Sequence, residues 1–320
     1  MEIYLTFDYE LFFGEKSGSV EKCLIEPTNN LFEIARNKNV SYTFFVDVGF
    51  LIAADKYNDL KIELSQVKTQ VKQMIQLGHS VQLHIHPHWE KAVFENGVWS
   101  MNVDGAYKLA DFSQEEAENI VRKYKSYLDD LIGYKTTTFR AGGWCIQPFS
   151  QLKDVFKELN LFVDTSVFRG AYLNTKHYSI DFRNTPSKSK YSFSTDVTVE
   201  DAMGDFTEYP ISSMRYSPSF FWWLYGLGRL FPKQHKMIGD GFAVGQGGRK
   251  WQILTSYTSF HVSSDGYYAK KLNASLQKSI HLNHKEMVVI GHPKAMTLYS
   301  KRMLDSFIQM NEMKHQFSSF

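Results

Sequence analysis

Hydrophobic and polar positions alternate in short segments and repeat at helical spacing between them over the first half of the chain. Residues 2–8 alternate, with Ile3, Leu5 and Phe7 on one side and Thr6 and Asp8 on the other, which is typical of a strand. Further strands are predicted over 41–47, 78–86, 135–140 and 161–164. Helices are predicted between them over 27–38, 59–77, 113–131 and 148–159. This alternation predicts an α/β fold with parallel strands and right-handed crossovers.

Two stretches interrupt this order, and we interpret them as insertions within a single domain covering residues 1–320. Residues 90–112 contain the turn signals Asn96-Gly97 and Asp104-Gly105, which favour a hairpin. Residues 170–285 have no clear period, although strands are predicted at 206–211 and 287–291 and a helix at 297–312. The glycine-rich piece 239–248 lacks the strand, lysine and hydroxyl of a phosphate loop, so an ordinary loop is predicted. The aromatic stretch 217–231 favours a buried helix but leaves a peripheral membrane contact open.

Composition narrows the class of protein. The 320 residues are 43% hydrophobic and 22% charged, with a formal charge of +2 and no basic stripe of the kind that binds nucleic acid. The two cysteines, Cys23 and Cys145, form no CxxC pair that would indicate a disulfide framework or a structural zinc site. Residues 1–7 already have the pattern of a strand rather than of a leader peptide. We therefore expect a cytoplasmic protein, and the sequence does not indicate an oligomeric state.

Four of the 11 histidines lie within residues 78–89. On an extended strand His84 and His86 point to the side opposite Leu83 and Ile85. Pro87 ends the strand, and a turn after it would bring His88 back beside His84. Because two imidazoles and one carboxylate are enough for an open catalytic metal site, we expect a divalent metal here. Zinc is favoured, while cobalt, nickel and iron remain alternatives.

Other polar side chains follow the predicted strands directly. In α/β barrels the carboxyl ends of the strands form one rim, where the catalytic residues lie. We therefore expect one site that contains Asp8, Glu10, Asp47, His84, His88, Arg140, Asp164 and His292.

At these positions the chain resembles the polysaccharide deacetylase family, the NodB-like carbohydrate esterases. The similar segments occur in the family's order: Thr-Phe-Asp-Tyr-Glu (6–10), Thr-Phe-Phe-Val (43–46), the histidine stretch (78–88), Phe-Arg-Ala-Gly-Gly (139–143), Asp-Thr-Ser-Val (164–167) and Gly-His-Pro (291–293). The chain departs from the family where Tyr9 replaces its second aspartate and Gly142-Gly143-Trp144 replaces its Pro-Tyr.

The resemblance implies a distorted (β/α)7 barrel and a metal-dependent deacetylase acting on an N-acetylated or otherwise N-acylated sugar. Carried over by position, Asp8 is the general base, Arg140 pairs with it, Asp164 steadies the array and His292 is the general acid. Glu10, His84 and His88 become the metal ligands, although the roles of Asp8 and Glu10 could be exchanged. The backbone amide near Gly143 could donate to the oxyanion. The residues expected to contact substrate are Asp47, His86, Gly143, Trp144 and Glu208.

The substrate that fits a cytoplasmic location is an intermediate of surface polysaccharide or lipopolysaccharide synthesis. Two alternatives remain. One is a related hydrolase of carbon–nitrogen bonds, such as a deformylase or a ureide amidohydrolase. The other is a non-catalytic barrel that binds carbohydrate.

Overall fold

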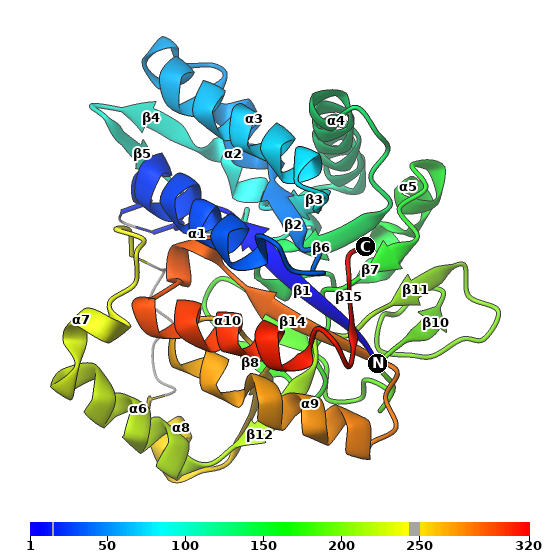
Figure 1. Ribbon diagram of the computed structural model, residues 1–320. Helices are drawn as coiled ribbons and strands as arrows, with labels where there is room; N and C mark the ends of the chain where they lie inside the picture. Colours follow the sequence, from blue (N-terminus) through cyan, green and yellow to red (C-terminus); the bar gives the residue numbers. More distant parts are fainter. Residues whose placement is uncertain (15, 243–249) are drawn as a thin grey trace.

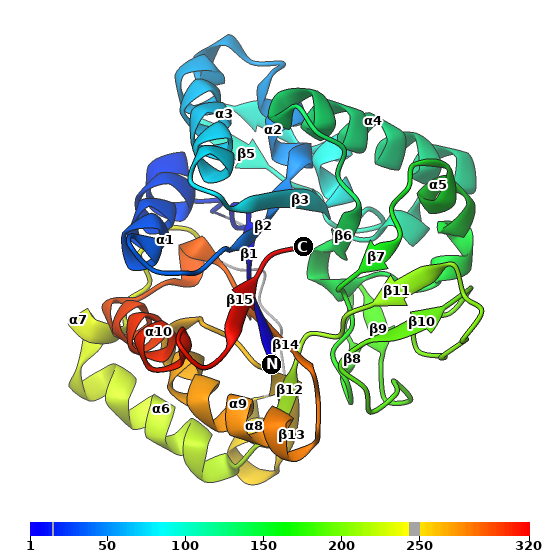
Figure 2. The same ribbon diagram turned by 45° about the vertical axis from the view of Figure 1, so that its right-hand side comes forward.

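A curled, mainly parallel sheet forms the centre of the molecule (Figures 1 and 2). The structure is a computed structural model that describes residues 1–14, 16–242 and 250–320. The strand order is β10–β11–β7–β6–β3–β2–β1–β14, and β15 pairs with the first residues of β1. The ladders are parallel except for β10–β11. The bounds are β1 (Glu2–Tyr9), β2 (Thr43–Asp47), β3 (Ser80–Ile85), β6 (Thr138–Ala141), β7 (Val163–Asp164), β10 (Tyr191–Phe193), β11 (Phe206–Glu208), β14 (Glu286–Gly291) and β15 (Gln316–Ser318).

Isolated bridges bring the two ends of this sheet together. β14 also forms parallel bridges from Val288 to Ile211, just after β11, and from Ile290 to Ser263. The predicted parallel, barrel-like α/β fold is therefore confirmed in its general form. The sheet has nine strands, and this number does not test the prediction of seven β/α units.

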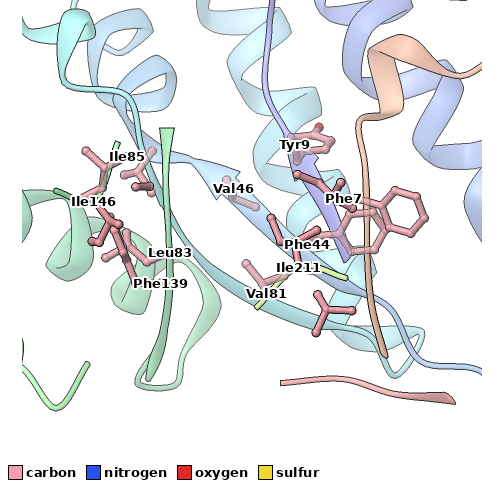
Figure 3. Packing of buried hydrophobic residues seen from close by; sticks show 14 of the residues in the cluster. Phe7, Tyr9, Phe44, Val46, Val81, Leu83, Ile85, Phe139, Ile146 and Ile211 are labelled. Carbon is pink, nitrogen blue, oxygen red and sulfur yellow. The ribbon is translucent and has the colours of Figure 1, made fainter. Parts of the chain in front are cut away.

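Helices surround the outer face of the sheet (Figure 2). They are α1 (Glu26–Ala35), α2 (Val48–Ala54), α3 (Lys61–Gln76), α4 (Gln114–Ile132), α5 (Lys153–Glu158), α9 (Leu272–His281) and α10 (Leu298–Asn311). The predicted capping box is present, because Ser113 and Glu116 bond each other's backbone N–H at the start of α4. Apolar side chains of β1, β2, β3 and β6 form the core under the helices, among them Phe7, Phe44, Leu83 and Phe139 (Figure 3). Each of these four is at most 2% exposed, so the helices cover the outer face of β1, β2, β3 and β6 at these positions.

The inner face of the sheet is polar. Alternation places Thr6 and Asp8 of β1, His84 of β3 and Arg140 of β6 on this face, and all four are buried. Phe320 fills its amino-terminal end: its ring stacks on Tyr4 with centroids 4.4 Å apart, and its N–H donates to Thr43 Oγ1 at 3.0 Å. Phe320 therefore covers this end of the polar face, while a pocket opens at the carboxyl ends of the strands.

The first insertion contains the predicted hairpin, β4 (Val93–Glu95) and β5 (Val98–Ser100). Asn96 and Gly97 both have positive φ, which is the geometry of a type I′ turn. The second insertion contains the hairpins β8 (Tyr172–Asn174) with β9 (Ser179–Asp181) and β12 (Ser213–Tyr216) with β13 (Thr258–His261), followed by α9. Between β12 and β13 lie α6 (Pro218–Leu230), α7 (Pro232–His235) and α8 (Lys250–Thr255).

The prediction that residues 217–231 form a buried helix is wrong in part. The helix is present as α6, but only Phe220 and Phe221 are buried in it, while Trp222 is 51% and Leu230 72% exposed. The cause is that α6 packs on α8 and on the small cluster around Tyr216 rather than in the main core. Of the predicted glycine loop, residues 243–249 lie outside the described residues. In the part of the chain that is described, no helix combines the length and the apolar character needed to cross a bilayer.

Candidate metal and catalytic site

A pocket of about 320 Å³ lies at the carboxyl ends of β1, β3 and β14. Asp8, Glu10, His84 and His292 line its floor, as expected from their positions at the ends of strands. Its walls are mostly aromatic, with Phe13, Tyr107, Trp144 and Tyr178 among the lining residues. The site therefore combines buried ionisable groups with apolar walls.

Glu10, His84 and His86 bring three donor atoms within 4.8 Å of one another. Glu10 Oε2 lies 3.1 Å from His84 Nε2 and 2.5 Å from His86 Nε2. The three residues are at most 4% exposed. Two imidazoles and a carboxylate form a donor set that binds a divalent metal such as zinc.

The hydrogen bonding of His84 fits a metal ligand. Its Nδ1 lies 2.8 Å from the carbonyl oxygen of Arg140, which can only accept. Nδ1 therefore carries a proton, and Nε2 is the ring atom that faces Glu10. Burial lowers the pKa of His84, but the carboxylates around it, Asp8 first, raise the pKa overall. Metal-binding histidines are usually held by such a bond from the second ring nitrogen.

The geometry places His86, and not the predicted His88, in this group. Pro87 does not begin a turn back toward His84 but starts the 3-10 helix Pro87–Lys91, which carries His88 away. His86 is still extended and therefore shares the inward face with His84. His88 is fully buried, and neither ring nitrogen has a hydrogen-bond partner among the described residues. Burial, followed by the nearby His86, holds the pKa of His88 well below its usual value.

Lys294 is a residue of the site that the sequence did not indicate. Its Nζ donates to Glu10 Oε1 at 2.8 Å and to the carbonyl of Leu11 at 2.7 Å, and the side chain is buried. Burial raises the pKa of Glu10, but the cations around it, Lys294 first, together hold that pKa well below its usual value. Glu10 is thus an ionised carboxylate with one oxygen bound by lysine and the other facing the histidines. The only signal was the position of Lys294 two residues after His292, and most lysines are exposed.

Asp8 forms the expected pair with Arg140. Arg140 Nη1 donates to Asp8 Oδ1 and to Thr6 Oγ1, each at 2.8 Å, and its Nε donates to the carbonyl of Thr165 at 2.9 Å. Burial raises the pKa of Asp8, but the charges of Arg140, His84 and His292 outweigh it and lower the pKa overall. Asp8 is therefore ionised at neutral pH, although it is only 4% exposed.

His292 lies on the other side of the pocket and is held by Asp265, a second residue that the sequence did not indicate. Asp265 accepts from the backbone N–H of His292 and from Nδ1, both at 2.7 Å. Nε2 lies 3.7 Å from Asp8 Oδ2 and 3.8 Å from Glu10 Oε1. Burial lowers the pKa of His292, but Asp265 and the other carboxylates raise it to about 9. His292 thus carries a proton at neutral pH.

Besides His88 and Arg140, three further predicted residues, Asp47, Asp164 and Glu208, do not line the pocket. Asp47 caps α2 through the N–H of Gly49 and accepts from Trp89 Nε1 at 2.6 Å. Asp164 accepts from the N–H and Oγ of Ser166 at 3.0 and 2.7 Å. Glu208 is fully buried opposite Asp164 in the β7–β11 register, where burial, followed by the charge of Asp164, raises its pKa well above the usual value. The expectation that Asp47 and Glu208 contact substrate does not fit these positions.

Asp164 acts on the site through its neighbours. Ser166 Oγ, which donates to Asp164, accepts from the N–H of Ala141 at 2.8 Å. Thr165 binds the side chain of Arg140 through its carbonyl and Oγ1. Asp164 therefore helps to fix the segment that orients Arg140, without touching Asp8.

The two glycines after β6 allow close packing around the donor group. A Cβ atom on Gly142 would meet His86 Nδ1 at 2.5 Å, and one on Gly143 would meet the Tyr107 ring at 2.6 Å. Gly143 and Trp144 line the pocket as predicted. Gly143 also has a φ of 59°, which favours glycine.

The two insertions meet at one side of the pocket. Tyr107 of the first stacks on Tyr178 of the second, with ring centroids 4.4 Å apart. Asp104 pairs with Lys176 at 3.2 Å and also with His177. These contacts close that side of the pocket with a wall built from segments about 70 residues apart.

The chain shares its fold with several solved proteins. A Mycobacterium smegmatis protein assigned as a polysaccharide deacetylase is 13% identical, with a TM-score of 0.55 over 99% of this chain and 86% of that one. The allantoinase Puue is 10% identical, with a TM-score of 0.53 over 99% and 87%. A 4-alpha-glucanotransferase from Thermococcus litoralis is 12% identical, with a TM-score of 0.51 over 100% of this chain but 39% of that one. No family model and no curated protein sequence matches the chain. At such low identities these likenesses show the fold alone.

Proposed function

We propose that this chain is a divalent-metal-dependent hydrolase that removes the acyl group of an N-acylated sugar, an intermediate of surface polysaccharide or lipopolysaccharide synthesis in the cytoplasm. The observation that carries the proposal is the three-donor group Glu10, His84 and His86 beside an ionised Asp8, with His292 across the pocket. The fold shared with an assigned polysaccharide deacetylase supports it. We interpret the curled sheet as the distorted sevenfold barrel of that family.

Glu10 Oε2 and the Nε2 atoms of His84 and His86 would hold the metal. Zinc suits this donor set best, and cobalt, nickel or iron could replace it. Bound there, the metal supplies an acidified water, with a pKa of about 7, and polarises the acyl oxygen. The charge of Lys294 compensates part of the negative charge of Glu10 and keeps Oε1 away from the histidines.

Asp8 is the better candidate for the general base. Both oxygens of Glu10 are in use, one by Lys294 and the other by the histidines. Arg140 holds Asp8 Oδ1, which leaves Oδ2 on the side of His292 and the pocket. Oδ2 would take the proton from the attacking water.

His292 would then donate its proton to the leaving nitrogen. Asp265 holds Nδ1, so that the proton on Nε2 faces the pocket. The backbone amide near Gly143 lies in the pocket wall, where it would stabilise the oxyanion. Water attack, proton uptake at Asp8 and proton donation from His292 together cleave the carbon–nitrogen bond and release a carboxylate and an amine.

The pocket suits one sugar unit or a chain end better than the interior of a polymer. Its volume of about 320 Å³ is at the small end of the range of ligand sites. The Tyr107–Tyr178 wall closes one side of the pocket. Aromatic rings such as Trp144 offer apolar faces to the faces of a sugar ring.

A panel of N-acetylated and N-formylated sugars and ureides, assayed for acetate, formate and ammonia, tests the reaction class. Acetate release that a chelator abolishes and zinc restores is expected. Asp8→Asn should keep zinc and lose turnover, whereas Glu10→Gln should lose zinc. The reverse result would exchange their roles, and release of formate or ammonia alone would assign the alternative carbon–nitrogen hydrolases. Sugar binding without turnover by the zinc-loaded protein would indicate a non-catalytic barrel.

A further inference from the structure

The segment between β12 and β13 exposes aromatic side chains outside the barrel. Trp222 is 51% exposed on α6, Trp251 is 74% exposed on α8, and Phe231, which follows α6, is 54% exposed. Figures 1 and 2 both show α6 and α8 at the outer edge of the molecule, and Trp222 Nε1 donates to the carbonyl of Leu254 on α8 at 3.0 Å. The two tryptophans therefore belong to one surface, which we call the aromatic edge (exposed residues of 222–231 and 251–257).

The sequence of this region contains more basic than acidic residues. The whole chain holds 34 acidic residues, yet the sequence between Glu208 and Asp265 contains one, Asp240. Asp240 is turned toward the barrel, where it accepts from the N–H of Ser19 at 2.8 Å. Among the described side chains of this stretch four are basic: Arg215, Arg229, Lys233 and Lys236. The aromatic edge thus presents apolar rings within a positive field.

The arrangement of α6 matches a helix that lies in a membrane interface. Trp222, Tyr225 and Arg229 are spaced by three and four residues and share one face of the helix. Phe220 on the opposite side, and Phe221 at the boundary between the two faces, pack on Tyr216. Tryptophan, tyrosine and arginine are the residues that proteins place at the level of lipid headgroups.

We propose that the aromatic edge binds the surface of a bilayer that contains anionic phospholipid. The exposed Leu230 extends the edge with aliphatic surface, which suits acyl chains and not nucleic-acid bases. The basic residues supply attraction to lipid phosphates. α6 has 13 residues, too few to cross a bilayer, so the contact is peripheral.

This contact would bring the pocket close to the membrane. The chain runs from α7 directly along the pocket rim: Met237 lines the pocket, and the N–H groups of Ile238 and Gly239 donate to the carbonyls of Met296 and Lys294 at 2.9 and 3.0 Å. Together with the proposed hydrolase function, on which this step rests, the membrane contact indicates a class of substrate. It would be a sugar attached to a carrier that is anchored in the same bilayer.

Co-sedimentation with vesicles tests the contact without turnover, so its outcome is separate from that of the hydrolysis assay. Vesicles of phosphatidylcholine with phosphatidylglycerol should bind the protein, and phosphatidylcholine alone should bind it more weakly. The double variant Trp222→Ser/Trp251→Ser should lose roughly tenfold in affinity per tryptophan. Arg229→Gln/Lys233→Gln should lose about fivefold per cation and reduce the salt dependence.

A matched control removes exposed apolar groups elsewhere. Ile62→Ser/Met313→Ser changes side chains that are 75% and 92% exposed, far from the aromatic edge in sequence, and should bind vesicles like the wild type. Circular dichroism and thermal melting establish that each variant is folded. Absence of binding to the anionic vesicles at low salt overturns the proposal, as does equal loss in the control. Binding to single-stranded RNA in place of vesicles would assign the surface to nucleic acid and overturn it as well.

Discussion

Replacing Gly142 by alanine tests the role of His86 with a single methyl group. The added Cβ would lie 2.5 Å from His86 Nδ1 and 2.6 Å from the carbonyl oxygen of Ile85, whereas ordinary contacts begin at 3.4 Å. Gly142 has no positive φ, so alanine is strained only by these contacts. Ile85 is fixed in the β3–β6 ladder opposite Ala141. The imidazole of His86 must therefore move by about 0.9 Å to relieve the first contact, and the backbone at Gly142 must move as well to relieve the contact with the Ile85 carbonyl.

The expected result is a loss of about 10-fold to 100-fold in zinc affinity, as for changes beside a metal ligand. Overpacking should also lower the free energy of unfolding by about 1–3 kcal/mol. Zinc affinity is measured by competition with a chromophoric chelator, and the unfolding energy by urea titration. Gly226→Ala is the control, because a Cβ there meets no atom of its surroundings within 4 Å. A folded Gly142→Ala protein with wild-type zinc affinity would refute the assignment of His86 as a ligand.

Three further predictions follow from the buried charges and the core. Lys294→Met removes the cation that lowers the pKa of Glu10, so in a pH titration zinc should be lost on acidification at a pH higher by about one unit or more; an unchanged midpoint would contradict this. His292 is protonated below a pKa of about 9, so kcat should fall as pH rises through that value, and Asp265→Asn should move this fall to lower pH. His292→Gln should lower kcat by about 10²-fold to 10⁴-fold and leave the zinc content unchanged. Leu83→Ala, at a fully buried position, should cost about 2–5 kcal/mol in urea unfolding; a smaller loss would mean that the core collapses around the cavity.

Local sequence patterns were sufficient for the elements of the first half of the chain. The alternation in β1, the capping box at Ser113 and the Asn96-Gly97 turn depend on residues close in sequence, and the structure has all three. The second insertion could not be predicted in this way, because its short hairpins depend on distant partners. α6 is apolar on most sides and was expected to be buried, but whether other elements pack over such a helix depends on the rest of the fold.

The same distinction applies to the site. The strand period placed His84, Asp8 and Arg140 on one face correctly, since that period is local. The choice between His86 and His88 depended on whether Pro87 begins a turn or a 3-10 helix, which the dipeptide does not decide. Lys294 reaches Glu10 across 284 positions of sequence, so no local pattern could reveal it.

Carboxylates near strand ends were the least reliable signal. Asp47 and Asp164 each bond the backbone N–H two residues later. Aspartate commonly caps turns in this way, and the sequence does not separate such a residue from one that faces a ligand. Position at a strand end therefore predicts the rim of the sheet but not the direction of the side chain.

Zinc content per chain, measured by elemental analysis after loading and desalting, tests the central claim most directly. Wild type, His86→Ala and His88→Ala are compared, each with its thermal melting curve. The geometry predicts one zinc in the wild type and in His88→Ala, and none in His86→Ala. Zinc retained by His86→Ala and lost from His88→Ala, or no zinc in the wild type, would contradict the site described here.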